Sequence, residues 1–132
     1  MEKNRKIVLI DDDVDFLEEL QTLLELSGYE TVAVTDEEMA VEIVRNTRPA
    51  MVFLDLKMPK KTGFQIAEEI RRCPEVWHVP IIAMSAYYKG VYKGLLSSCG
   101  IDNCLTKPFQ PLDVIAEIER VFDKNNIAFE AA

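Results

Sequence analysis

Five polar residues stand at or just beyond the ends of short apolar runs, and their side chains suit the binding of a cation and of a phosphate group. They are Asp11, Asp12, Asp55, Ser85 and Lys107. Two unit charges about 4 Å apart repel by roughly 4 kcal/mol at an effective dielectric near 20, so converging carboxylates would need a cation. Oxygen ligands with room for water suit Mg²⁺, which also binds phosphate oxygens. The pattern predicts a magnesium site that handles phosphate, provided that the fold brings these distant residues together.

Brief apolar runs predict the strands that would position these residues. Four runs rich in β-branched residues are bounded by polar residues or by Pro and Gly, namely 7–10, 31–34, 51–54 and 81–84. Their near-continuous apolar sequence implies burial on both faces of a parallel sheet. A fifth and weaker run, 102–105, starts with a polar residue and therefore suits the edge of that sheet.

A helical period marks the segments between the strands. In the first of these segments, apolar residues recur at three- and four-residue intervals from Phe16 to Leu24, and Gly28 stands where a C-terminal cap is expected. After the last strand, Pro111 suits a first helical turn, and an apolar stripe runs over 114–122. These patterns predict the first and the last helix.

Capping boxes predict where two further helices begin. Thr35 with Glu38, and Thr62 with Gln65, both have the spacing of a residue pair that satisfies the free amides of a helix start. The fourth helix is expected over 89–98, where two glycines should weaken it by about 1 kcal/mol each relative to alanine.

Alternating strands and helices predict an α/β fold of the (βα)5 type. The sheet should be parallel and doubly wound, with helices on both faces and right-handed crossovers. We expect one domain over residues 1–124 and a C-terminal tail over 125–132. In such sheets functional groups gather at the carboxyl ends of the strands, which is where the five polar residues stand.

Composition narrows the class of protein. The formal net charge of −8 over 132 residues would repel nucleic acids, so direct binding to them is not expected. The apolar run 7–10 is too short for a signal peptide or a membrane span, and we expect a cytoplasmic protein. Cys73, Cys99 and Cys104 lack the spacing of a disulfide framework or a zinc site, which predicts reduced thiols.

Four stretches of the chain resemble the four signatures of response-regulator receiver domains, the phosphorylated domains of two-component and chemotaxis signalling. The stretches are Ile7-Val8-Leu9-Ile10-Asp11-Asp12, Val52-Phe53-Leu54-Asp55-Leu56-Lys57-Met58-Pro59, Ile82-Ala83-Met84-Ser85-Ala86 and Leu105-Thr106-Lys107-Pro108-Phe109. They follow one another in the family's order and at its usual separations, and together they cover nearly the whole chain. The resemblance implies a flavodoxin-like sheet with the strand order 2-1-3-4-5.

The resemblance also implies a role for each acidic residue. Asp55 would be the phosphoacceptor and a metal ligand, Asp12 a direct ligand, and Asp11 a ligand that acts chiefly through water. Lys57 would supply its backbone carbonyl to the metal. The implied cofactor is Mg²⁺, with Mn²⁺ as a substitute.

Other positions take their expected roles from the same resemblance. Lys107 would pair with Asp55 and later with the phosphoryl group, and the Ser85 hydroxyl would bind a phosphoryl oxygen and move with it. Ala86 would leave space for access to the site. The peptide bond between Lys107 and Pro108 is expected to be cis.

Three residues would modulate the switch or depart from the family pattern. Receivers commonly carry an aromatic residue at the position of Cys104, so a ring movement cannot report phosphorylation here, and Ser85 with the fourth helix would carry the signal instead. The side chains of Lys57 and Tyr87 could lie over the phosphoryl site and obstruct an attacking water. We therefore hypothesise slow loss of the phosphoryl group.

The resemblance implies a signalling domain that catalyses only its own phosphorylation and dephosphorylation. The phosphodonor would be a phosphohistidine on a sensor histidine kinase or a histidine phosphotransfer protein. The readout would be the surface of the fourth helix, fifth strand and fifth helix, which would bind a downstream effector or form a dimer.

Two alternatives stand beside this interpretation. An aspartate-dependent phosphatase of the haloacid dehalogenase type also begins with an acidic pair after its first strand, and Asp11 with Asp13 would supply it. A pseudo-receiver would use the same fold only as a binding surface. Taken alone, Asp11 and Asp12 could also simply stabilise the start of the first helix through its macrodipole, by about 0.3–1 kcal/mol each.

Overall fold

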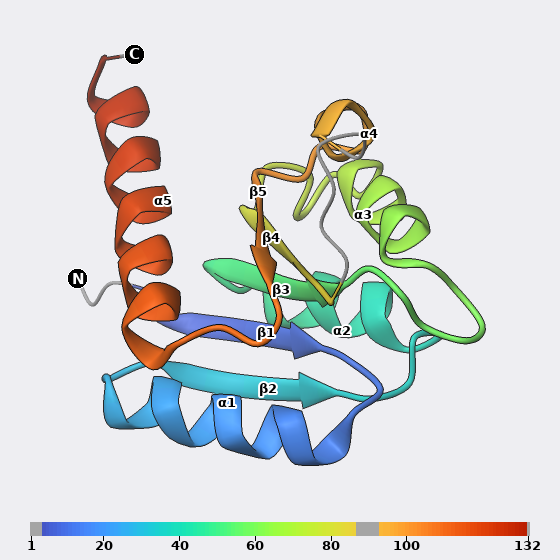
Figure 1. The fold of residues 1–132 in the computed structure, drawn as a ribbon. Coiled ribbons are helices and arrows are strands. Elements are labelled where there is room, and N and C mark those ends of the chain that lie inside the picture. The colour runs from blue at the N-terminus through green and yellow to red at the C-terminus, as the bar shows by residue number, and fades with distance from the viewer. Residues whose placement is uncertain (1–3, 87–92, 132) are drawn as a thin grey trace.

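The structure is a computed structural model that describes residues 4–86 and 93–131. Strands and helices alternate strictly along the chain (Figure 1). In order they are β1 (Lys6–Ile10), α1 (Val14–Leu26), β2 (Glu30–Val34), α2 (Ala40–Thr47), β3 (Met51–Asp55), α3 (Gly63–Arg71), β4 (Ile81–Ser85), α4 (Lys93–Ser98), β5 (Asn103–Thr106) and α5 (Pro111–Ala131). Among the described residues, no helix is long and apolar enough to cross a membrane.

The five strands form one parallel sheet in the order β2-β1-β3-β4-β5, as the resemblance implies. The central strands β1, β3 and β4 are almost entirely buried, whereas the edge strands β2 and β5 are partly exposed. The sequence-based expectation that the apolar runs are buried on both faces is therefore confirmed for the three central strands.

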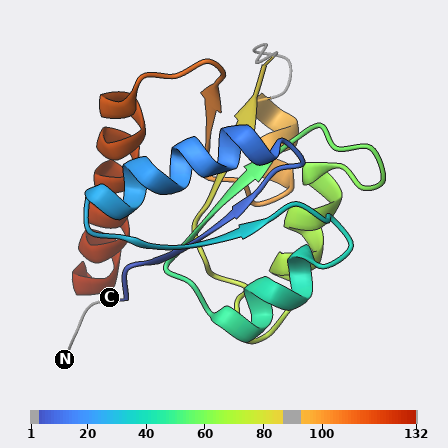
Figure 2. The same cartoon turned by 90° about the horizontal axis from the view of Figure 1, so that it is seen from below.

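Alternation along the strands divides the core into two layers, one on each face of the sheet. In β1, Ile7 and Leu9 pack with α1 and α5, whereas Val8 and Ile10 pack with α2, α3 and α4. The two views agree with this division: α1 and α5 lie on one side of the sheet, and α2 and α3 lie on the other (Figures 1 and 2). Because the sheet is parallel, the carboxyl ends of all five strands lie at one edge.

Local sequence explains where most helices begin and end. The side chain of Asp13 accepts a hydrogen bond from the Phe16 amide and caps α1, and Gly28 follows that helix with φ +93°. The predicted capping box of Thr62 and Gln65 is present at the start of α3. Pro111 is the first residue of α5, as predicted.

The capping box predicted at Thr35 was wrong. Helix α2 begins at Ala40, and Met39 precedes it without a side-chain cap. The Asp36 carboxylate instead accepts a hydrogen bond from the Glu38 amide, and this local turn competes with an earlier helix start. The neighbouring Glu37 is buried, where it accepts a hydrogen bond from the Lys60 amide at 2.5 Å.

The last two helices also differ from the predicted ranges. Helix α4 is described over Lys93–Ser98, and the start of the predicted range 89–98 lies outside the described residues. Helix α5 continues to Ala131, so residues 125–131 extend this helix and do not form an irregular tail. The domain boundary at residue 124 stays a prediction.

Arg71, at the end of α3, joins two connections of the chain through three backbone carbonyls. Its guanidinium donates hydrogen bonds to the backbone carbonyls of Trp77 at 2.7 Å, Val79 at 2.6 Å and Gly100 at 2.9 Å. Gly100 belongs to the turn between α4 and β5 and has φ +74°, a conformation that favours glycine. One side chain therefore fixes the turn after α4 to the segment that precedes β4.

Candidate functional site

Three carboxylates meet at the carboxyl ends of β1 and β3. One oxygen from each of Asp11, Asp12 and Asp55 lies within 4.8 Å of the other two. Asp11 and Asp55 are buried and Asp12 is exposed, so the cluster opens to solvent on the side of Asp12. The predicted convergence of these distant residues is therefore present in the structure.

Asp55 lies in an environment that disfavours its charge. Burial, the neighbouring charge of Asp11 and, to a smaller extent, that of Asp12 raise the pKa of the Asp55 carboxyl from 3.8 to about 6. Lys107 and the Lys57 amide, which donates to Asp55 Oδ1 at 3.4 Å, oppose this rise. Lys107 does not bring the pKa of Asp55 back to its usual value, so the pocket is suited to a further cation.

Lys107 reaches the pocket from the loop after β5. Its Nζ lies 2.6 Å from Asp11 Oδ2 and 3.9 Å from Asp55 Oδ1, so Asp11 is its closer partner. Sequence reasoning expected the Asp55 pair and missed Asp11, because sequence spacing does not define which of two adjacent carboxylates a flexible lysine reaches. The backbone between Lys107 and Pro108 is cis, as expected, and the Lys107 amide donates to the Ser85 carbonyl at 2.8 Å.

The remaining predicted residues surround this centre. Ser85 ends β4, pairs in register with Thr106 and is partly buried, and Ala86 beside it is exposed. The side chain of Lys57 is exposed on the loop after β3. Tyr87 lies outside the described residues, so its predicted position over the site stays a prediction.

Cys104 occupies the position where an aromatic residue was expected from the family pattern. It lies on β5 opposite Ala83 of β4 and packs at the margin of the core. Burial raises the pKa of its thiol to about 11, so the thiol stays protonated at neutral pH. Cys104 therefore acts as a small, neutral packing group at this position.

Two residues near the site were not singled out from the sequence. A Cβ atom on Gly63 would lie 2.4 Å from the Asp55 carbonyl oxygen and 2.8 Å from the Leu56 Cα atom, so only glycine lets α3 approach the end of β3 this closely. Glu37 holds the loop after β3 through the Lys60 amide. The capping box at Thr62 points to the helix start, but nothing in the sequence signals the close approach at Gly63.

Comparison with known families identifies the family to which this chain belongs. Residues 7–119 match the family model described as the response regulator receiver domain. The chain belongs to the response regulator receiver domain family. This receiver domain is therefore part of two-component signalling, as the four sequence signatures predicted.

Curated relatives of this receiver domain are transcriptional regulatory proteins. The alkaline phosphatase synthesis transcriptional regulatory protein PhoP of Bacillus subtilis is 30% identical over 125 residues, which cover 95% of this chain and 51% of the relative. The CpxR homolog of Haemophilus influenzae is 33% identical over 120 residues, which cover 91% of this chain and 51% of the relative. The chain thus spans about half the length of the curated relatives it matches.

Solved structures of low sequence identity share the fold of this receiver domain. The chemotaxis protein CheY4 of Vibrio cholerae superposes with a TM-score of 0.86 at 24% identity, over 90% of this chain and 99% of the other. The receiver domain of the sensor histidine kinase PA1611 of Pseudomonas aeruginosa, described with a magnesium ion in its active site cleft, superposes with a TM-score of 0.81 at 24% identity, over 89% of this chain and 97% of the other.

The donor set of this receiver domain fits a hard divalent cation. Three carboxylates, one of them exposed, offer oxygen ligands and leave an open side for water or phosphate oxygens. No histidine or cysteine belongs to the described cluster, which disfavours zinc. The residues present therefore suit Mg²⁺.

Proposed function

We propose that Asp55 accepts a phosphoryl group from a phosphohistidine, donated by a sensor histidine kinase or a histidine phosphotransfer protein. One observation carries the proposal: Asp55 shares a carboxylate cluster with Asp11 and Asp12 while the Lys107 ammonium lies at the same pocket. This arrangement joins a nucleophile, a cation site and a fixed positive charge within one open pocket.

The reaction is a transfer between two side chains. An Asp55 carboxylate oxygen attacks phosphorus and forms a new O–P bond, while the P–N bond to the donor imidazole breaks and the imidazole nitrogen takes up a proton. Lys107 stabilises the charge on the phosphoryl oxygens, and the Ser85 hydroxyl donates to one of them. Water later removes the phosphoryl group from Asp55.

The metal would be held by residues of this chain. Asp12, Asp55 and the Lys57 backbone carbonyl would bind Mg²⁺, or Mn²⁺ in its place, with Asp11 contributing through water. When bound, the ion neutralises negative charge that would otherwise repel the incoming phosphoryl group. The raised pKa of Asp55 supports this role, because an ion beside the carboxylate favours the ionised and nucleophilic form.

The output follows from contacts that exist only after phosphorylation. A ligand shifts a conformational equilibrium only by binding one state better than the other, and Ser85 with Lys107 supplies that difference through the phosphoryl oxygens. We place the readout on the surface of α4, β5 and α5, which would bind a downstream effector or a second copy. Since the relatives are transcriptional regulatory proteins, an attached output domain is one such effector.

The phosphatase alternative loses its main support. Its acidic pair would be Asp11 and Asp13, but the Asp13 side chain is used to cap α1 and accepts from the Phe16 amide. The third carboxylate comes instead from Asp55 on β3. A pseudo-receiver remains as the second candidate, since it would share every feature of the fold.

Labelling with a small phosphodonor tests the proposal. Incubation with acetyl phosphate and Mg²⁺ should add one phosphoryl group, seen as a mass increase or on a phosphate-affinity gel, and chelation of Mg²⁺ should prevent it. Asp55→Asn should abolish labelling, while Asp13→Asn serves as the matched acidic control and should retain it. A chain that stays unlabelled and does not bind beryllofluoride would be a pseudo-receiver, and multiple-turnover hydrolysis of small phosphate esters would favour the phosphatase.

A further inference from the structure

The Lys107 ammonium contacts an aromatic ring as well as the carboxylates of the pocket. Lys107 Nζ lies 4.2 Å from the centroid of the Phe16 ring, a distance typical of a cation–π contact. The same ammonium binds Asp11 at 2.6 Å and lies 3.9 Å from Asp55. The cation is therefore held between two carboxylates and one ring.

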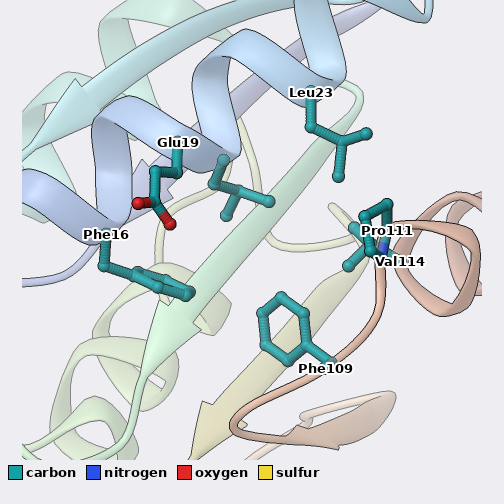
Figure 3. A pocket seen from close by; sticks show the side chains of 7 residues that line it. Phe16, Glu19, Leu23, Phe109, Pro111 and Val114 are labelled. Carbon is teal, nitrogen blue, oxygen red and sulfur yellow. The ribbon is translucent and has the colours of Figure 1, made fainter.

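A second ring orients the first. Phe109 stands two residues beyond Lys107, and its ring meets that of Phe16 edge to face, with centroids 5.7 Å apart and an interplanar angle of 74°. Both rings project into the groove between α1 and the start of α5 (Figure 3). The loop that carries Lys107 thus also supplies Phe109, which fixes the orientation of the Phe16 ring.

The start of α1 links this ring to the acidic pocket. The Phe16 amide donates to Asp13 Oδ1 at 3.1 Å, and the Asp13 amide donates to Asp11 Oδ1 at 3.0 Å. Asp11 then accepts from Lys107 through its other oxygen. The ring and the carboxylate that share the ammonium are therefore held by one short chain of hydrogen bonds.

We infer that Phe16 is a positioning residue. Its ring keeps the Lys107 ammonium at the distance from Asp55 that phosphoryl transfer needs. The inference rests on the proposed function. A lysine has a flexible four-carbon stem, so the place of its charge depends on what the ammonium contacts. The negative face of the ring provides a contact that an aliphatic side chain of similar size cannot replace.

The core role of Phe16 is small by comparison. It is only partly buried and lines the groove, while the fully buried contacts of α1 to the sheet are made by its neighbours Leu17, Leu20 and Leu24. A leucine at position 16 would keep most of the apolar contact and lose only the ring. This separation makes Phe16→Leu a specific perturbation.

The test compares Phe16→Leu with Phe16→Tyr and with the matched control Phe122→Leu, which removes a ring packed in the same core layer against Tyr29. The phosphorylation rate is measured over a range of acetyl phosphate and of Mg²⁺. We expect Phe16→Leu to lower the maximal rate about threefold to tenfold, since an aromatic contact to a partly desolvated cation has about that effect. The half-saturating Mg²⁺ concentration should stay the same, and both Phe16→Tyr and Phe122→Leu should label at the wild-type rate.

A spectroscopic arm separates the inference from the proposed function. In proton–carbon NMR spectra the Lys107 ε-methylene should be shifted upfield by the ring in the wild type and in Phe16→Tyr, and should return to an ordinary shift in Phe16→Leu. Wild-type rates in Phe16→Leu, or a Phe16→Tyr variant as slow as Phe16→Leu, would overturn the inference. If the wild type is not labelled at all, the proposed function fails, and an unshifted Lys107 signal then also rejects the positioning contact.

Discussion

In the absence of a divalent cation, the charge of Asp55 should lower the stability of this protein, and Asp55→Asn should restore the lost stability. Asp55 is 7% exposed and shares its cluster with two other carboxylates. Without a divalent cation, burial and the neighbouring charge of Asp11 are the two main effects that disfavour the ionised form of Asp55. An asparagine keeps the shape of the side chain and removes the charge.

The magnitude follows from the pKa of Asp55. A rise from 3.8 to about 6 corresponds to about 3 kcal/mol at about 1.36 kcal/mol per pKa unit. The folded state binds the proton more tightly than the unfolded state, so this cost is absent below pH 3.8, grows between 3.8 and about 6, and is complete above about 6. Since the amide forms its own contacts and the pocket relaxes, we expect Asp55→Asn to gain about 1–3 kcal/mol at pH 7.5.

Urea denaturation in the presence of a chelator measures this gain. The free energy of unfolding is compared between wild type and Asp55→Asn at several pH values from 4 to 7.5. The other acidic groups are common to both proteins, so the difference isolates Asp55. Mg²⁺ should then stabilise the wild type more than the variant, by about 2.7 kcal/mol if it is present at a hundredfold excess over its Kd.

Two results would refute this reasoning. Equal stability of wild type and Asp55→Asn at pH 7.5 would mean that the ionised carboxylate is well accommodated without a cation. A gain that does not shrink as the pH falls from 6 toward 4 would mean that something other than the charge of Asp55 is responsible.

Two further predictions concern the loop after β3 and its surroundings. Gly63→Ala should destabilise the fold by about 1–3 kcal/mol, because the new Cβ would overlap the Asp55 and Leu56 backbone. The control Gly94→Ala should not destabilise the fold, because no heavy atom of the described residues lies within 4 Å of a Cβ at that position. Urea denaturation compares the two variants. If Lys57 and Tyr87 obstruct the attacking water, Lys57→Ala and Tyr87→Ala should each speed the decay of the phosphorylated protein several-fold. The decay is followed after removal of the phosphodonor. A decay rate equal to that of the wild type would contradict the idea.

Much of the site could be predicted from the sequence because it depends on strand order and on strand ends. Once the runs 7–10 and 51–54 are adjacent parallel strands, the residues that follow them must meet at one edge of the sheet. Asp11, Asp12 and Asp55 are therefore brought together by topology alone. The capping box at Thr62 was predictable for a similar reason, since its hydrogen bonds join residues only three positions apart.

The missed features depend on competition between contacts in three dimensions. Lys107 could reach either of two carboxylates, and its ring contact with Phe16 joins residues that nothing in the sequence relates. The capping box expected at Thr35 failed because an alternative turn formed at Asp36 and because the carboxylate of Glu37 accepts a hydrogen bond from the Lys60 amide, on the loop after β3. Such outcomes follow from which partner lies nearer after folding, and residue types do not specify that.

The clamp at Arg71 has a consequence for how α4 can respond. Because the guanidinium pins the turn at Gly100, the C-terminal end of α4 stays attached to the segment that precedes β4. We expect any displacement of α4 on phosphorylation to be smaller at Gly100 than along the rest of the helix. A partner protein that distinguishes the two signalling states would therefore gain little from contacts with this turn.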